Sequence, residues 1–211
     1  MPMEGEHPLE TPWTFWYDKK SYKKTSTGVF YNKLRKLCTF STIEEFWAVY
    51  CHLKRPSSIE GNVNLYLFRD GPNIVPMWEA FPRGGCWLLK IRKKSAHEGG
   101  APSILGTIWH DLVLALIGEA FEEPTVVGLS LAIRKMEDVV CLWNADNRNV
   151  DIQMKIGSKL REVLNLEPST VIEYKAHADS LNDLSTFRNT KAYVFAARPE
   201  SVQQPGGKEE T

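Results

Sequence analysis

The sequence predicts an α+β protein built on one largely antiparallel sheet, and three observations support that prediction. Short apolar or alternating segments recur along the chain, three longer segments repeat apolar residues at helical spacing, and turn residues separate neighbouring segments. An antiparallel sheet can carry helices on one face and leave the other face open. A curved open face of this kind is a natural ligand site.

Eight segments have the alternation or the β-favouring composition of strands. The first contains the aromatic run that begins at Trp13, and a hairpin turn is expected at residues 135–138. Residues 18–28 are polar and rich in lysine, which predicts an exposed loop. The predicted strands are 13–17, 33–40, 64–68, 87–92, 126–134, 139–143, 171–177 and 192–196.

Three segments have the apolar periodicity of helices. Thr42 and Glu45 form a capping box at the start of the first, because a threonine and a glutamate three residues apart satisfy free backbone N–H groups. The second helix is apolar on more than one side, which predicts either deep burial or a docking surface. The predicted helices are 42–52, 104–121 and 150–164.

The length of 211 residues predicts a single domain, which we place at residues 7–198. Residues 1–6 carry no pattern and residues 199–211 are rich in Pro, Gly, Gln and Glu, so both ends are expected to be disordered tails. No apolar run is long enough to span a bilayer and the first residues do not form a signal peptide. We therefore expect a cytoplasmic protein, with the nucleus as a second location, that acts as a monomer.

The charge balance limits the ligands that the protein can take. The 26 basic residues equal the 26 acidic residues, so non-specific wrapping of a long polyanion is not expected and any anion site must be a local cluster. The four cysteines form no C-x-x-C pair, which argues against a metal site and indicates reduced thiols. Seven tryptophans predict several packing or stacking roles.

Three groups of residues indicate the chemistry of a ligand site. Trp78 stands next to Glu79 in the stretch Pro76-Met77-Trp78-Glu79, where the ring offers a π face and the carboxylate can accept two hydrogen bonds from a guanine edge. An aromatic pair, Phe30-Tyr31, ends the lysine-rich loop. Arg134 lies at a strand end, with Trp143 on the partner strand.

Eight motifs between about residues 7 and 195 resemble the eukaryotic translation initiation factor 4E family, and they occur in the family order. They are His7-Pro8-Leu9, Trp13 to Tyr17, Phe40 to Tyr50, Leu67 to Gly71, Pro76 to Glu79, Gly84 to Trp87, Leu116 to Glu119, and Glu173 to Asp179. The resemblance implies a curved eight-stranded sheet with three helices on the convex face and a concave face that holds the 7-methylguanine cap of messenger RNA. It implies a binding protein with no catalytic residues, no cofactor and no metal.

In this family the cap guanine carries a positive charge and lies between two aromatic rings, so cation–π attraction distinguishes it from unmethylated guanine. Carried over to this sequence, the resemblance places Trp78 and Phe30 as the two rings. Glu79 is expected to bind the guanine edge, Trp143 to pack against the N7 methyl group, and Arg134 to contact the phosphate bridge.

The sequence departs from the family pattern at the second ring and at the phosphates. Phe30 stands where tryptophan or tyrosine is usual, which predicts a weaker site, and the longer preceding loop leaves Tyr31 as an alternative stacker. Cys86 and Val139 occupy positions where arginine and lysine are usual, so the phosphate clamp is depleted. The basic residues considered as replacements are Arg148, Arg188 and Lys191.

The resemblance also implies a second binding surface on the convex face. There the family binds a short helical motif of the scaffold subunit 4G, or of 4E-binding proteins that mimic it. His110 stands where leucine is usual, which predicts weaker apolar contact and altered partner choice. The residues that match this surface are His7, Pro8, Leu9, Ile43, Trp47, His110, Asp111, Leu114 and Gly118.

Three alternatives stay open at this point. A cap-binding repressor that fails to recruit the scaffold subunit shares the same cap site. A hydrolase would need Cys86 or Cys141 beside one of the histidines at 97, 110 and 177, but no spacing supports a triad. A β-rich carrier of an apolar ligand would be indifferent to the N7 methyl group.

Overall fold

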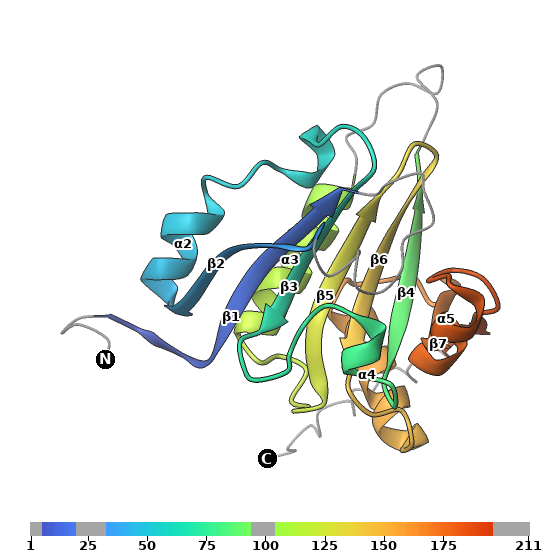
Figure 1. The fold of residues 1–211 in the computed structure, drawn as a ribbon. Helices are drawn as coiled ribbons and strands as arrows, with labels where there is room; N and C mark the ends of the chain where they lie inside the picture. Colours follow the sequence, from blue (N-terminus) through green and yellow to red (C-terminus); the bar gives the residue numbers. More distant parts are fainter. Residues whose placement is uncertain (1–5, 20–32, 94–103, 196–211) are drawn as a thin grey trace, which may run out of the picture.

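The computed structural model describes residues 6–19, 33–93 and 104–195, and Figure 1 shows their fold. Eight antiparallel strands form one twisted, curved sheet in the order β2-β1-β3-β5-β6-β4-β7-β8. The prediction of a mostly antiparallel eight-stranded sheet is confirmed. The strands are β1 Pro8–Lys19, β2 Arg35–Thr42, β3 Val63–Arg69, β4 Gly85–Arg92, β5 Val126–Ile133, β6 Glu137–Asn144, β7 Ile172–Ala176 and β8 Lys191–Tyr193.

Three helices pack their apolar residues against one face of the sheet, which we call the convex face. They are α2 Ile43–Tyr50, α3 Leu105–Ile117 and α4 Val150–Val163. The convex core that they share with the strands includes Phe46, Leu112 and Ile156, each fully or almost fully buried. Figure 1 shows α3 and α4 behind the sheet and α2 beside β2 at its edge. The three predicted helices on the convex face are therefore confirmed.

A fourth helix, α5 His177–Asp183, was not predicted. The predicted strand 171–177 ends at Ala176, and His177 begins the helix instead. Residues 177–183 show no helical periodicity, because α5 is short and largely polar, with only His177 and Ser180 buried. The helix lies at the edge of the sheet beside β7 and β4 and contacts the loop that carries Trp78.

Other element boundaries differ from the predicted ones by a few residues. The helix predicted to run to residue 121 ends at Ile117, because Glu119 adopts the left-handed conformation, with φ 53°. The capping box exists with a shift of one residue, since the Thr42 hydroxyl accepts a hydrogen bond from the Glu45 N–H while the Glu45 carboxylate accepts one from the Ser41 N–H. The predicted tails at 1–6 and 199–211 lie outside the described residues apart from residue 6.

The alternation of side chains gives the sheet a second, smaller cluster on the opposite, concave face. On β3, Leu67 points into the convex core, whereas Tyr66 and Phe68 point the other way. Gly128 on β5 makes room for Phe68, because a Cβ there would lie 2.5 Å from the Phe68 ring. The concave cluster consists of Leu34, Tyr66, Phe68, Phe81, Cys86, Leu88, Val127, Val139, Cys141 and Trp143.

No helix within the described ranges is long and apolar enough to cross a bilayer.

Candidate ligand site on the concave face

Trp78 lies on the edge of the concave cluster and is only partly buried. It begins a short 3-10 helix, Trp78–Ala80, that follows the loop after β3. Pro76 and Met77 are buried directly before it, and the Phe81 N–H donates to the Trp78 carbonyl at 3.0 Å. The turn therefore holds the Trp78 side chain against the cluster, where it stays partly exposed. Glu79 is exposed beside it.

Trp143 forms the floor of this region rather than its rim. Only 4% of the residue is exposed, and its Nε1 donates to the Ser130 hydroxyl at 2.8 Å. Its ring meets Phe68 edge-on, with centroids 5.3 Å apart, and lies 4.5 Å from the ring of His177. Direct contact of Trp143 with a ligand methyl group, which the resemblance implies, stays a prediction and requires the exposed edge of the ring.

His177 supports the concave cluster from the start of α5, whereas the sequence prediction placed it at the end of the strand 171–177. It is fully buried at the start of α5, and its Nδ1 pairs with the Phe81 carbonyl at 2.9 Å. Burial lowers the pKa of His177 to about 4, so the ring is neutral at pH 7. With Nδ1–H donating to Phe81, the bond ties α5 to the loop that carries Trp78.

Arg134 is held by groups at the end of the sheet. Its Nη1 donates to the carbonyls of Val63 at 3.1 Å and Ile133 at 2.8 Å, and its Nη2 donates to Asn64 Oδ1 at 2.5 Å. Burial lowers the pKa of Arg134 from its usual range. Three of the guanidinium N–H groups are thus committed within the protein, which fixes the orientation of the plane.

Asp18 corrects the expectation of an exposed loop at residues 18–28. β1 extends through Lys19, and Asp18 is 3% exposed on the same face of the sheet as Tyr66. The Asp18 carboxylate accepts hydrogen bonds from Asn64 and Tyr66, which supply the polar contacts that a buried acid needs. The period of two that places Trp16 and Asp18 on one face was the available signal. Residues 20–28 lie outside the described residues.

The second stacking ring is not placed. Phe30 and its alternative Tyr31 both lie in the segment 20–32, outside the described residues. Both choices for that ring therefore stay predictions.

Cys86 and Val139, the positions where the family has basic residues, belong to the concave cluster. They are 0% and 7% exposed, so this part of the face is apolar. A hydrogen bond with Cys141, followed by burial, raises the pKa of the Cys86 thiol well above its usual range. A thiol of that kind is a poor nucleophile, which weakens the hydrolase alternative.

Among the described residues, no contact joins Trp78 to the three basic residues considered as replacements. Arg148 forms an exposed ion pair with Asp146. The Arg188 carbonyl accepts a hydrogen bond from the buried Lys175, and Lys191 is exposed on the edge strand β8. These observations connect none of the three to Trp78.

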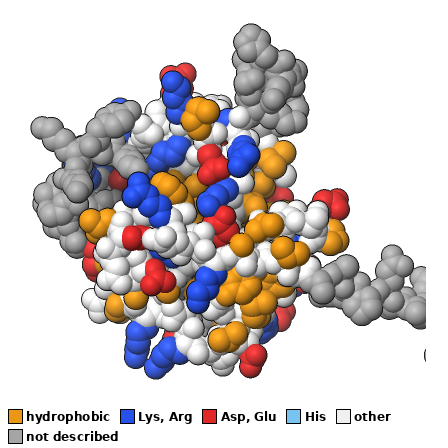
Figure 2. All heavy atoms as spheres, turned by 90° about the vertical axis from the view of Figure 1, so that its right-hand side faces the viewer, with side chains coloured by type: hydrophobic (Ala, Val, Ile, Leu, Met, Phe, Trp, Pro, Cys, Tyr) orange, Lys and Arg blue, Asp and Glu red, His pale blue; other side chains and the backbone are white. Residues whose placement is uncertain are grey.

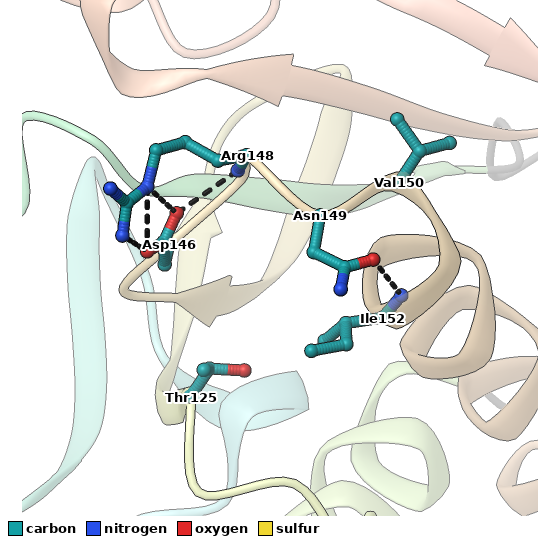
Figure 3. Close-up of a pocket in the computed structure, with 6 residues that line it drawn as sticks. All are labelled: Thr125, Asp146, Arg148, Asn149, Val150 and Ile152. Carbon is teal, nitrogen blue, oxygen red and sulfur yellow. Dashed lines mark hydrogen bonds and ion pairs between the residues drawn. The ribbon is translucent and has the colours of Figure 1, made fainter.

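A pocket of about 440 Å³ opens at the start of α4, outside the concave cluster (Figure 3). Asn149 caps α4 there by accepting hydrogen bonds from the N–H groups of Asp151 and Ile152. The Asp146–Arg148 ion pair forms one side of the pocket in Figure 3. The lining residues are Thr125, Asp146, Arg148, Asn149, Val150 and Ile152, so none of the five predicted ligand residues lines it.

The predicted partner surface is assembled around α2. Ile43 and Trp47 are 42% and 45% exposed on one side of this helix. His7 lies against the start of α2, because its carbonyl accepts from the Ile43 N–H and its Nδ1 lies 2.7 Å from the Glu44 carboxylate. Hydrogen bonds from the His7 ring and from the His7 backbone N–H to the Glu44 carboxylate lower the pKa of Glu44 to about 2. Pro8 and Leu9 continue from His7 into β1.

The neighbouring part of this surface comes from α3. His110 stacks on Tyr50 of α2, with ring centroids 5.7 Å apart, and its Nδ1 lies 3.3 Å from the Tyr50 hydroxyl. His110, Asp111 and Leu114 are partly buried, and Gly118 is exposed at the C-cap. The structure thus brings residues from α2 and α3 into contact, and the Tyr50–His110 pair joins the two helices.

Its fold and concave cluster together place the chain among α+β proteins whose open sheet face carries a cluster of aromatic residues. The family model described as eukaryotic initiation factor 4E matches residues 8–192. The chain therefore belongs to the eukaryotic initiation factor 4E family.

Curated relatives support this assignment over most of the chain. The eukaryotic translation initiation factor NCBP of Oryza sativa subsp. japonica is 34% identical over 189 residues, which cover 88% of this chain and 78% of the rice protein. The eukaryotic translation initiation factor 4E-1A of Danio rerio is 34% identical over 193 residues, covering 90% and 85%.

Two solved structures share the fold. The C. elegans eIF4E-3, in a complex with the 4E-binding protein Mextli and a cap analog, superposes with a TM-score of 0.73 at 29% identity. That match covers 84% of this chain and 96% of the C. elegans chain. The Ascaris suum eIF4E-3 in complex with an m7G cap gives a TM-score of 0.71 at 31% identity, covering 82% and 92%.

Proposed function

We propose that the protein binds the 7-methylguanosine cap of messenger RNA on its concave face and regulates translation initiation through a partner on its convex face. The observation that carries the proposal is the placement of Trp78, which packs against the aromatic cluster of the concave face but stays partly exposed, with the exposed Glu79 next to it. Relatives of this chain were solved with an m7G cap and with a cap analog, which supports the same ligand class.

The exposed part of Trp78 suits a flat cation. A 7-methylguanine ring stacked there gains cation–π attraction of about 0.5–2 kcal/mol per aromatic face. The Glu79 carboxylate then accepts hydrogen bonds from the N1–H and the exocyclic amine of guanine, a pair that adenine does not offer. Phe30 supplies the second ring in this proposal, with Tyr31 as the alternative.

Trp143 and Arg134 have supporting roles in this proposal. Trp143 offers the edge of its ring to the N7 methyl group from the floor of the site. Arg134 directs toward the phosphate bridge the N–H groups that Val63, Ile133 and Asn64 leave available.

Retention on immobilised 7-methyl-GTP tests the cap-binding part. The wild-type protein should be retained and eluted by free 7-methyl-GTP but not by GTP. Trp78→Ala and Glu79→Gln should flow through, while Trp47→Ala, which removes a half-exposed tryptophan on the other face, should be retained. Wild-type protein that flows through, or that GTP elutes equally well, would refute the proposal.

The second ring needs its own pair of variants. Phe30→Trp should bind 7-methyl-GTP several-fold more tightly, because tryptophan is the best cation–π partner. Tyr31→Ala should then be close to wild type. No gain in the first variant combined with loss of binding in the second would assign the ring to Tyr31.

The convex partner is proposed to be a short amphipathic helix from the scaffold subunit 4G or from 4E-binding proteins. Ile43 and Trp47 present exposed apolar area, and Leu114 borders them from α3. A related protein was solved with the 4E-binding protein Mextli. Isothermal titration with a scaffold peptide and with a 4E-binding-protein peptide decides between activator and repressor, since a repressor should bind only the second.

His110 is the residue that favours the repressor alternative. Its imidazole stacks on Tyr50 and presents polar nitrogens where an aliphatic side chain would give apolar contact. His110→Leu should strengthen scaffold-peptide binding if this residue limits it. An unchanged affinity for the scaffold peptide would mean that His110 does not favour the repressor alternative.

A further inference from the structure

A chain of hydrogen bonds links a buried acid to Arg134 across three strands. Asp18 on β1 lies opposite Asn64 on β3, and Asn64 lies opposite Ala132 on β5. The Asn64 side-chain amide donates to both carboxylate oxygens of Asp18, at 2.5 and 3.2 Å. The carbonyl oxygen of the same amide accepts from Arg134 Nη2 at 2.5 Å. One asparagine therefore bridges a carboxylate and a guanidinium.

The two charges at the ends of this chain are both withdrawn from solvent. Asp18 is 3% exposed, and the Tyr66 hydroxyl donates to it at 3.2 Å in addition to Asn64. Burial raises the pKa of the Asp18 carboxyl, and the hydrogen bonds that Asn64 and Tyr66 donate to it oppose part of that rise by stabilising the ionised carboxylate. Arg134 is partly buried and its Nη1 is held by two backbone carbonyls. Charges that share a region of low dielectric act on each other and on a third charge far more strongly than charges in water.

The neighbouring cations on β4 and just beyond it are also paired with acids. Lys90 lies 2.7 Å from Glu173, Lys93 lies 3.1 Å from Asp138, and Arg92 lies 3.8 Å from Glu137. On the side of the molecule with β4, β7 and α5, Figure 2 shows basic and acidic side chains interleaved rather than a continuous basic surface. Among the described residues, the positive charges of Lys90, Arg92 and Lys93 are thus each compensated by a neighbouring acid.

We propose that Asp18 is a specificity-determining residue that, through Asn64, holds Arg134 and offsets its charge, so that the site binds the methylated base and draws little affinity from the phosphate chain. This inference rests on the proposed cap-binding function. Asp18 does not touch the ligand in this account. It sets how strongly the site distinguishes a cap triphosphate from the same nucleoside with fewer phosphates.

The test uses three ligands that differ only in phosphate number: 7-methylguanosine, its monophosphate and its triphosphate. Calorimetry on the wild-type protein at fixed ionic strength should give a triphosphate affinity less than about 10-fold above that of the monophosphate. Asp18→Asn keeps an acceptor for Asn64 and Tyr66 but removes the charge. The affinity of this variant for the triphosphate should rise about 5- to 10-fold, and its affinity for the nucleoside should not change. Its binding of the triphosphate should also depend more steeply on salt concentration than that of the wild-type protein.

Two further variants keep the result specific. Asp70→Asn removes a carboxylate at the far end of β3, where it bonds Thr14 and Lys36, and should leave all three affinities unchanged. In an Asp18→Asn protein that also carries Arg134→Gln, the gain on the triphosphate should disappear. Equal changes for all three ligands, or no gain on the triphosphate, would overturn the proposal.

If Asp18→Asn does not fold, the ligand affinities of the single variant Arg134→Gln test the proposal. Because the wild-type charge is offset, this variant should weaken triphosphate binding by less than about 5-fold relative to the nucleoside. A loss above about 30-fold that appears only with phosphates would contradict the inference. Failure of the proposed function is a separate result, since wild-type protein would then bind 7-methyl-GTP and GTP alike.

Discussion

Trp87 and Trp143 project from neighbouring strands to opposite faces of the sheet, and they are held in different ways. Trp87 points to the convex side, where its Nε1 donates to the Gln153 carbonyl of α4 at 3.1 Å. Gly157 of the same helix leaves it room, since a Cβ there would lie 2.5 Å from the indole. Trp143 points to the concave side, and its ring neighbours Phe68, Phe81 and His177 come from strands, a loop and the short α5.

The difference shows how one sheet serves stability and binding at once. On the convex face whole helices cover the aromatic residues, so removing a side chain there leaves a cavity. On the concave face a smaller cluster supports a partly buried ring, Trp78, and a buried polar network lies at one end of the sheet. Substitutions on the first face should change mainly folding, and those on the rim of the second should change mainly ligand affinity.

The largest expected effect is on the convex core. Trp87→Ala should lower the free energy of unfolding by about 3–5 kcal/mol, because a fully buried indole and its hydrogen bond are lost. Trp78→Ala should cost less than about 1.5 kcal/mol, since that ring is partly exposed already. Urea denaturation followed by circular dichroism measures both, and equal losses would contradict the comparison of the two faces.

The next-largest effect is a pH dependence of folding stability that comes from His177, on the concave face. The folded-state pKa of His177 is about 4, below its usual value of 6.5, so the unfolded chain takes up this proton first as the pH falls. Stabilisation by neutral His177 is complete above pH 6.5 and is lost between pH 6.5 and 4, by up to ~3 kcal/mol. Stability curves of wild type and His177→Gln should converge over that window, and parallel curves would show that the buried imidazole does not titrate there.

A smaller effect tests whether the two binding faces are independent. Trp47→Ala should weaken a partner peptide by at least ~30-fold, as expected when a central aromatic anchor is removed. Its affinity for 7-methyl-GTP should stay within about two-fold of wild type. Parallel titrations of both ligands measure this, and a joint loss of both would mean that the faces are coupled.

The smallest effect concerns the helix that carries Trp47. Thr42→Ala removes the hydroxyl that accepts from the Glu45 N–H and should cost about 1 kcal/mol of stability. Thr42→Ser keeps the hydroxyl and serves as the matched control. Thermal denaturation of both variants makes the comparison, and a loss as large in the serine variant would indicate that packing of the buried Thr42, rather than capping, matters.

Periodicity predicted the convex side of the molecule well, because burial against one face imposes it. Within each helix, the helical spacing of apolar residues indicates which side chains face the sheet. Phe46 of α2, Ile108 and Leu112 of α3, and Ile156 of α4 belong to these sets, and all are buried. The same rule failed for α5, whose buried residues are polar and too few to form a stripe.

The concave site was only partly accessible to sequence reasoning. Trp78 and Glu79 stood out because a π face beside a carboxylate suits a guanine edge and because the stretch Pro76 to Glu79 resembles a family motif. Asp18 and Asn64 did not, because their contact depends on the pairing of β1 with β3, which residues far apart in the sequence determine together. The contact of His177 with Phe81 was equally inaccessible, since the two residues lie 96 positions apart in the sequence.

The account depends most directly on the preference of the Trp78 site for a positively charged purine ring. Titration of tryptophan fluorescence with 7-methyl-GTP and with GTP, in wild type and Trp78→Ala, measures that preference. The account predicts quenching by 7-methyl-GTP at a concentration at least ~10-fold below that needed for GTP, with the difference abolished in the variant. Identical titrations with the two nucleotides in wild type, or an undiminished preference in Trp78→Ala, would contradict it.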